Sequence, residues 1–168
     1  MEVANLEEII ANFVIQNKEN YYRLAYYYVK NSADALDVVQ EAIIKALSKK
    51  ESLKNPDAIK TWFYQIVVHT ALDLLRKQKR SVIVDDETLT IYDSGHTDHY
   101  DDMDLKKALD TLPIQYQSVI VLRYMEDLKI NEIALVLNEN ANTVKTRLYK
   151  ALNLLRIQLD EVEEGDFQ

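Results

Sequence analysis

The spacing of apolar residues predicts helices along most of the chain. Apolar positions between 6 and 14 repeat every three or four residues, and a second run from 21 to 29 has the same period and five tyrosines. We interpret these tyrosines as core residues, because aromatic side chains at helical spacing are usually interior; a stacking platform for bases is the alternative. A third run starts at Ser32, whose hydroxyl is expected to cap a helix that extends to Lys50.

The segment from Asn55 to Arg80 predicts one long central helix. Asn55 has a capping side chain, and Pro56 is favoured at the first helical position because its missing N–H has no partner there. At about 100° per residue, apolar side chains fall on two opposite sides of this helix. One side holds Ile59, Phe63, Ile66, Val67, Thr70 and Leu74, and the other holds Val68, Leu72 and Leu75.

A narrow polar edge separates those two apolar sides. It carries Trp62, Gln65, His69, Arg76 and Arg80, and Lys77 and Lys79 add charge at its end. Cations meet phosphates, an indole offers a stacking surface, and Gln and His read base edges, so the edge suits a nucleic-acid strand. A solvated edge with a cationic cluster at the helix C-terminus is the alternative.

The helical period is lost between Ser81 and Asp104, a stretch without any Lys or Arg. We predict a flexible acidic linker here and interpret it as an electrostatic shield over the flanking basic surfaces. His96 and His99 lie among aspartates in this linker, but the stretch predicts no rigid scaffold, so we expect no metal site. The period returns at Leu105 and is interrupted near Pro113.

Residues 128–156 have the pattern of a helix-turn-helix. A short helix with inward Ile130, Ile133, Ala134 and Leu137 leads to a turn containing Asn138 and Asn140, which tolerate a left-handed backbone and cap helices. The second helix points Val144, Leu148, Ala151, Leu152 and Leu155 inward. Its outward residues are Thr143, Lys145, Thr146, Arg147, Tyr149 and Lys150. These suit the major groove of DNA, and a helical hairpin with a solvated cationic face is the alternative.

Charge is distributed unevenly, which reconciles a net charge of −8 with a polyanionic partner. Residues 1–80 hold 12 Lys and Arg against 10 Asp and Glu, and residues 105–159 hold 8 against 5. Residues 81–104 and 160–168 have no basic residue and hold 8 and 5 acidic ones. We therefore predict an all-α protein with two small helical domains, 1–80 and 105–168, joined by an acidic flexible linker, 81–104.

The composition also excludes several classes of protein. The chain has no Cys and only 2 Gly, so it lacks thiolate metal ligands and any glycine-rich phosphate loop. No catalytic set occurs at a usable spacing, and the apolar runs are too short to cross a bilayer. We expect a cytoplasmic protein without enzymatic activity, cofactor, bound metal or direct membrane insertion.

The order of these parts resembles the extracytoplasmic-function (ECF) sigma factors of the sigma-70 family. The first lobe carries DALDVVQEAIIKAL and IKTWFYQIVVHTALDLLRKQKR, and the second carries ALDTLPIQYQSVIVLRYMEDLKINEIA and NTVKTRLYKAL. The words KNPDAIKTWFYQI, VDDET and NTVKTRLYKAL are similar to the sigma-V-type branch of Gram-positive bacteria. Gln65, His69, Asn138 and Glu139 depart from the usual residues of the family, which affects the preferred minus-10 sequence and the turn.

The resemblance implies sigma regions 2 and 4 and three sets of binding residues. Those that would bind the clamp helices of the largest RNA polymerase subunit are Asp37, Gln40, Glu41 and Ile44. Those that would bind the promoter minus-10 element are Asn55, Lys60, Trp62, Gln65, His69, Arg76, Lys77, Lys79 and Arg80. Those that would bind the minus-35 element are Thr143, Lys145, Thr146, Arg147, Tyr149 and Lys150.

The resemblance also implies regulation by a membrane-anchored anti-sigma factor that holds the protein at the inner face of the membrane, in a cell-envelope stress response. Two other functions are open from the residues alone. A helix-turn-helix regulator would bind an operator as a dimer without polymerase, although no heptad or strongly apolar dimer face supports it. A helical adaptor would bind protein only.

Overall fold

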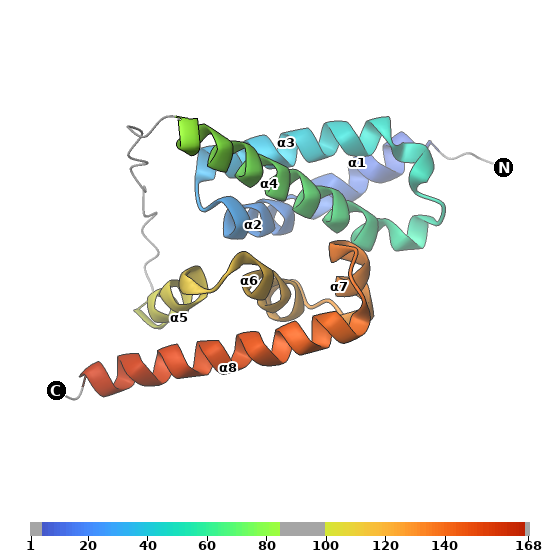
Figure 1. The fold of residues 1–168 in the computed structure, drawn as a ribbon. Helices are drawn as coiled ribbons and strands as arrows, with labels where there is room; N and C mark the ends of the chain where they lie inside the picture. Colours follow the sequence, from blue (N-terminus) through green and yellow to red (C-terminus); the bar gives the residue numbers. More distant parts are fainter. Residues whose placement is uncertain (1–4, 85–99, 167–168) are drawn as a thin grey trace. The chain divides into compact units, whose positions relative to one another are not determined.

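A computed structural model describes the backbone of residues 5–84 and 100–166 and the side chains of residues 5–80 and 105–160. Every regular element in these ranges is helical, which confirms the predicted all-α class. The chain divides into two compact units, one built around α2, α3 and α4 and the other around α6 and α8 (Figure 1). No helix in the described ranges is long and apolar enough to cross a membrane.

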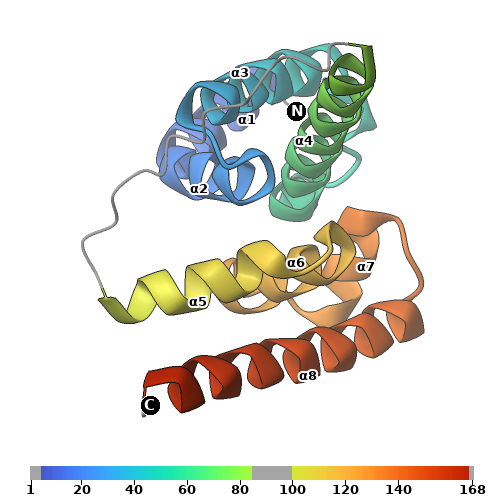
Figure 2. The ribbon, with the colours of Figure 1, turned by 60° about the vertical axis from the view of Figure 1, so that its left-hand side comes forward.

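The first unit is a bundle of four helices. They are α1 (Leu6–Gln16), α2 (Lys18–Val29), α3 (Ser32–Ser48) and α4 (Ile59–Val84), with short 3-10 turns η1 (Lys50–Ser52) and η2 (Pro56–Ala58) between α3 and α4. Helices α2, α3 and α4 pack pairwise against one another, as the rotated view shows (Figure 2). Tyr21, Leu24, Phe63 and Val67 fill the space between them. The ring of Tyr21 meets that of Phe63 edge-on, with centroids 4.4 Å apart.

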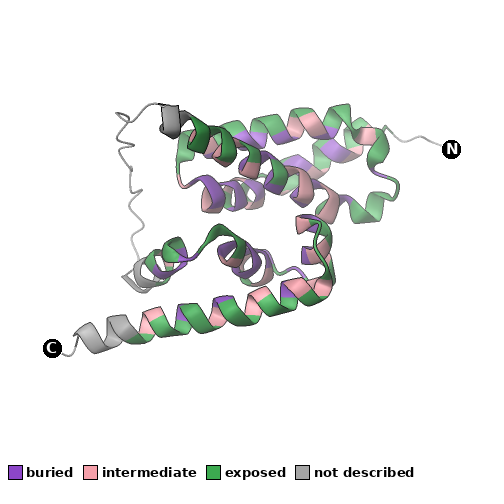
Figure 3. Cartoon of the chain, in the orientation of Figure 1, coloured by how far each residue is buried: buried purple, intermediate pink, exposed green. Residues whose placement is uncertain are grey.

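The core of this unit confirms α4 as a central helix. Phe63 and Val67 are buried on one side of it and Val68 on the other, and the burial pattern of the unit is visible in Figure 3. Tyr21 and Tyr28 are buried, as expected of core tyrosines, while Tyr22 and others of that run are half-buried. The tyrosine run is therefore chiefly a packing element.

Caps define where α3 and α4 begin. The side chain of Asn31 accepts a hydrogen bond from the Asp34 amide at 3.0 Å, so the predicted cap at Ser32 was wrong by one residue. Asn31 has the extended backbone that a cap requires, whereas Ser32 is already helical. Asn55 accepts from the Asp57 amide at 3.1 Å with Pro56 following, as predicted, but the first turn, η2, is a 3-10 turn.

The second unit consists of α5 (Tyr100–Thr111), α6 (Ile114–Ile120), α7 (Ile130–Leu137) and α8 (Ala141–Asp166). Helices α5 and α6 both pack on α8. The spacing of Tyr116, Val119, Ile120 and Arg123 predicts an ordinary helix after Pro113, but α6 widens into a π-turn, η3 (Val121–Met125). The Arg123 guanidinium donates to the Leu128 carbonyl at 3.0 Å, and Asp127 has φ 55°, so a tight left-handed corner ends this segment.

Two helices extend into the stretch 81–104 that was predicted as a linker. Helix α4 continues through Ser81 to Val84, and α5 begins at Tyr100. Residues Val82 to Val84 are apolar and carry no helix-breaking Gly or Pro, so the preceding helix propagates through them. The remainder of the expected linker, including His96 and His99 and its interpretation as a shield, lies outside the described residues.

Candidate protein and nucleic-acid interfaces

Helix α3 exposes a continuous mixed surface, which we call the α3 face. Its members lie within about 140° of the helix circumference and are all exposed. They are Leu36, Asp37, Gln40, Glu41, Ile44 and Leu47. The opposite side of α3 is buried against α2 and α4 through small residues such as Ala35, Ala42 and Ala46.

Two apolar members of the α3 face distinguish it from an ordinary solvated surface. Ile44 is 67% exposed and Leu36 is 50% exposed, and the exposed Gln40 lies one turn from each. The helical period of residues 32–50 predicts an inward stripe of Ala35, Val39, Ala42, Ile43, Ala46 and Leu47, but Leu47 is exposed and Val38 is buried. The error arose because Leu47 lies about 100° around the helix from Ala46, on the solvent side of the packed stripe. Leu36 was missed, although its spacing of eight residues from Ile44 places both on one side.

The polar edge predicted on α4 is present as a row, which we call the α4 edge. Trp62, Gln65, His69, Arg76 and Arg80 fall within about 60° of one another along the helix. The indole Nε1 of Trp62 donates to Ser52 Oγ at 2.9 Å, and the Ser52 hydroxyl donates to the Lys49 carbonyl at 2.7 Å. Trp62 is half-buried, so it fastens turn η1 to the beginning of α4.

The other residues predicted for the same strand are more scattered. Lys77 and Lys79 are exposed near the end of the α4 edge. Lys60 is exposed on the opposite side of the first turn of α4 and does not join the row. Asn55 is exposed but its side-chain oxygen already caps the chain at η2. The row is therefore formed by α4 itself, with Lys60 and Asn55 at its loop end.

His69 has an altered pKa on the α4 edge. Partial burial lowers the pKa of the imidazole; Asp73 raises it, and Arg76, Lys49 and Lys45 lower it further. We expect an NMR titration of the ring to give a pKa below that of an unfolded histidine. The neutral ring then favours the folded state at neutral pH, and that contribution is lost as the pH falls through the folded-state pKa. Asp73→Asn should lower the pKa of His69 below its value in the wild-type protein, because the carboxylate that raises it is removed. A rise in the pKa of His69 would contradict this explanation.

The turn between α7 and α8 has the geometry that the sequence predicts. Asn138 has φ 54°, in the left-handed region, and the Glu139 amide donates to the Ala134 carbonyl at 2.9 Å. The Asn140 side chain accepts from the Asn142 amide at 2.8 Å and caps α8. At the start of α7, the Glu132 carboxylate accepts from the Lys129 amide at 2.9 Å. Side-chain hydrogen bonds to backbone amides thus cap the N-termini of both α7 and α8.

The outward face of α8 borders a hollow of about 360 Å³. Its lining comes from α6 and α8 and consists of Gln115, Tyr116, Asn142, Thr143, Thr146, Arg147 and Lys150. Lys145 and Tyr149 are exposed beside it. Two cations and several hydroxyl and amide groups in one hollow suit a phosphate backbone. Gln115, Tyr116 and Asn142 are not among the predicted minus-35 residues, and the first two belong to α6, which lies far from α8 in sequence.

Two of these α8 residues are held by neighbours. The Arg147 guanidinium pairs with the Glu139 carboxylate at 3.1 Å, and the Thr146 hydroxyl donates to the Asn142 carbonyl at 2.9 Å. Lys150 makes no ion pair or side-chain hydrogen bond among the residues that the structure describes. Lys145 makes none within the described residues either, so these two ammonium groups need no rearrangement to meet a phosphate.

The fold defines a helical protein of two units, the second of which contains a helix-turn-helix. Sequence comparison matches residues 13–81 to Sigma-70 region 2 and residues 102–155 to Sigma-70, region 4. The RNA polymerase sigma factor SigV of Bacillus subtilis is 55% identical over 151 residues, covering 90% of this chain and 91% of that protein. The ECF RNA polymerase sigma factor SigW of the same organism is 31% identical, covering 93% and 91%.

The chain therefore belongs to the sigma-70 family of RNA polymerase sigma factors, in its ECF group. Two solved structures share the fold. The sigma factor RpoE of Bartonella quintana, crystallised with the anti-sigma factor NepR, has a TM-score of 0.79 at 24% identity, covering 89% of this chain and 96% of that one. CnrH in complex with the cytosolic domain of CnrY has a TM-score of 0.68 at 20% identity, covering 90% and 88%. The predicted family membership is confirmed.

Proposed function

We propose that the three surfaces divide the work of this sigma factor among them. The α3 face binds the RNA polymerase core, the α4 edge with Lys60 and Asn55 holds the opened minus-10 element, and the outward face of α8 reads the minus-35 element. The observation that carries this assignment is the α3 face, because it presents exposed apolar residues within an acidic surface on the unit that also bears the α4 edge. As an initiation factor, the chain leaves the chemistry of RNA synthesis to the polymerase.

The chemistry of the α3 face fits a protein partner better than DNA. Asp37 and Glu41 would repel phosphates. Burial of Ile44 and Leu36 against another protein would contribute favourable free energy to binding, because it removes apolar surface from water. Buried apolar anchors with a charged rim are typical of interfaces that are specific and reversible. A basic and apolar helical surface of the polymerase would complement both features.

The α4 edge is too weakly charged to open DNA alone. DNA stacking is worth about 1.4 kcal/mol per base-pair step, so several steps cost several kcal/mol. The edge offers a half-buried indole, one amide, one imidazole and a few cations for that work. A polymerase that binds both the α3 face and the duplex would raise the local concentration of DNA at the α4 edge. That increase would supply the remaining free energy for strand opening.

Run-off transcription tests the proposal. Purified core polymerase is incubated with the chain and with DNA from upstream of its own gene, and the control omits the chain. We expect a defined transcript that requires the chain. Operator binding by a dimer without core would instead favour a conventional helix-turn-helix regulator, and binding of protein without any effect of DNA would favour an adaptor.

Lys150→Ala should weaken contact with the minus-35 element. Because one phosphate contact is lost, the slope of log affinity against log salt should fall by about one unit. The measurement is a salt titration of holoenzyme on promoter DNA. Arg156→Ala removes a charge from an exposed position further along α8 and serves as the matched control. An unchanged slope for Lys150→Ala in a folded protein would reject the assignment.

We propose further that an anti-sigma factor controls this chain by covering its binding surfaces. One solved structure of similar fold is a sigma factor co-crystallised with an anti-sigma factor, which supports the proposal by analogy of fold. The exposed apolar residues of the α3 face supply a surface that needs such a cover when polymerase is absent. A membrane-anchored partner would hold the chain at the cytoplasmic side until an envelope stress releases it.

A further inference from the structure

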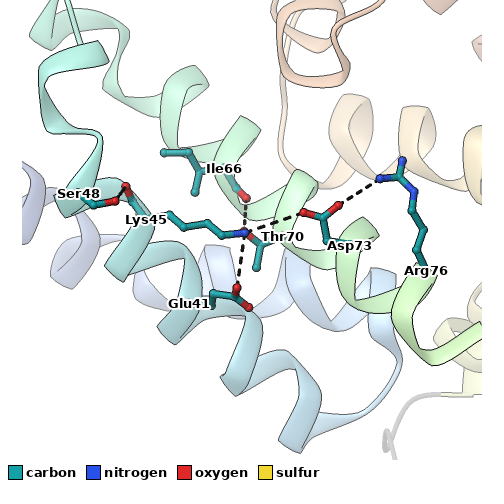
Figure 4. A network of polar contacts seen from close by, with 7 residues as sticks. All are labelled: Glu41, Lys45, Ser48, Ile66, Thr70, Asp73 and Arg76. Atoms are coloured by element: carbon teal, nitrogen blue, oxygen red, sulfur yellow. Dashed lines mark hydrogen bonds and ion pairs between the residues drawn. The ribbon is translucent and has the colours of Figure 1, made fainter. Parts of the chain in front are cut away.

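Lys45 lies between the α3 face and the α4 edge and contacts residues of both helices (Figure 4). Its Nζ donates to Thr70 Oγ1 of α4 at 3.2 Å. It also lies 3.6 Å from Glu41 Oε1 and 4.0 Å from Asp73 Oδ2. On the circumference of α3, Lys45 falls about 40° from Glu41, at the border between the exposed face and the buried stripe. One ammonium is therefore shared by one carboxylate of each surface.

Thr70 fixes the position of this ammonium. Thr70 is buried, and its hydroxyl donates to the Ile66 carbonyl at 2.7 Å, which leaves the oxygen lone pairs to accept from Lys45. The Lys45 side chain is only 30% exposed, compared with 53% for Glu41 and 51% for Asp73. The cation is thus held at the helix contact, and the two carboxylates compete for it from the solvent side.

Asp73 in turn holds a residue of the α4 edge. Its second oxygen, Oδ1, accepts from Arg76 Nη1 at 3.1 Å, and the Arg76 side chain is 66% exposed. A carboxylate beside Arg76 competes with any phosphate that the guanidinium would bind. Asp73 therefore restrains Arg76, and the strength of that restraint depends on how fully Lys45 neutralises Asp73.

We propose that Lys45 is a positioning residue that couples binding at the α3 face to strand binding at the α4 edge. When a cation of the polymerase takes Glu41, the Lys45 ammonium turns to Asp73, and Arg76 becomes free for a DNA phosphate. This inference rests on the proposed roles of both surfaces. It gives region 2 a route by which core binding raises its affinity for the opened strand.

The test is the affinity for a single-stranded oligonucleotide carrying the non-template minus-10 sequence, measured by fluorescence anisotropy with the free chain and with holoenzyme. The ratio of the two affinities is the gain on core binding. Lys45→Met should reduce this gain about two- to five-fold, which is the change in affinity that the free energy of an exposed ion pair corresponds to. Its affinity for core should not fall, because Glu41 is then released from Lys45, and Lys45→Arg should retain at least half of the gain.

Lys49→Met is the matched control. Lys49 is the exposed residue at the C-terminal cap of α3, one turn beyond Lys45. Its side chain makes no ion pair or hydrogen bond within the described residues, so its replacement removes the same charge only. Equal gains in Lys45→Met and Lys49→Met would overturn the proposal. Failure of wild-type holoenzyme to bind the oligonucleotide would instead contradict the function proposed for the α4 edge.

Asp73→Asn gives a second test with the opposite sign. It frees Arg76 permanently, so the free chain should bind the oligonucleotide about two- to five-fold more tightly and gain less from core. A general field effect of the lost negative charge would persist in Arg76→Gln, whereas release of Arg76 would not. A tighter affinity that survives in the double variant Asp73→Asn with Arg76→Gln would overturn the proposal, as would a weaker affinity in Asp73→Asn.

Discussion

Replacing Ile44 with arginine should lower the affinity for core polymerase about 30-fold and abolish run-off transcription at limiting concentrations of the factor. A central apolar anchor of an interface is worth about 2 kcal/mol or more, and a buried guanidinium in its place adds a desolvation cost. Because Ile44 is 67% exposed in the free protein, the fold should tolerate the change. Competition binding against a labelled sigma factor measures the affinity.

Ile15→Arg is the natural control for that experiment. Ile15 is 72% exposed on α1, so it resembles Ile44 in residue type and exposure but lies outside the α3 face. We expect its affinity for core to stay within two-fold of the wild-type value, roughly the scatter of surface substitutions. If Ile15→Arg and Ile44→Arg lost affinity equally, core binding would not depend on the α3 face.

Phe63→Ala should destabilise the first unit by about 3–5 kcal/mol, as large aromatic-to-alanine changes in a core do. Phe63 is fully buried, and its ring centroid lies 4.4 Å from that of Tyr21, so the change leaves a cavity between α2 and α4. Such a loss is a large part of the stability of a small domain. Native-state hydrogen exchange should show faster exchange in α2 and α4.

Two comparisons make the Phe63 result specific. Phe13→Ala removes a half-buried ring whose centroid is 5.9 Å from that of Tyr21, and it should cost clearly less. Amides of α6 and α8 belong to the other compact unit and should keep their exchange rates. A loss below about 1.5 kcal/mol for Phe63→Ala would mean that the core collapses around the missing ring.

Elements of this fold with strong local signals were predictable from sequence. The period of α4, the cap at Asn55 and the left-handed Asn138 all follow from a few residues acting on their own neighbourhood. The π-turn η3 was not predictable, because its apolar residues have no period that differs from a continuing helix. The end of α4 was missed because the loss of helical period and of basic residues after Arg80 was taken for the start of the linker.

The sequence predicted which residues share a helix face, but it did not predict which side chains contact one another across helices. The outward residues of α8 and the row on α4 follow from helical geometry alone. The contacts of Trp62 with Ser52 and of Lys45 with Thr70 span 10 and 25 residues, and no spacing rule predicts them. Gln115 and Tyr116 join the α8 hollow for a similar reason, because the packing of α6 on α8 brings together residues far apart in sequence.

The hydrogen bond between Trp62 and Ser52 gives the chain an optical reporter of its own. Trp62 is the single tryptophan among 168 residues, so light absorbed at the red edge of the indole band excites one known position. That position is a half-buried ring at the loop end of the α4 edge, fastened to η1 at 2.9 Å. Its emission therefore reports, without a label, whether turn η1 is closed on α4 or displaced from it.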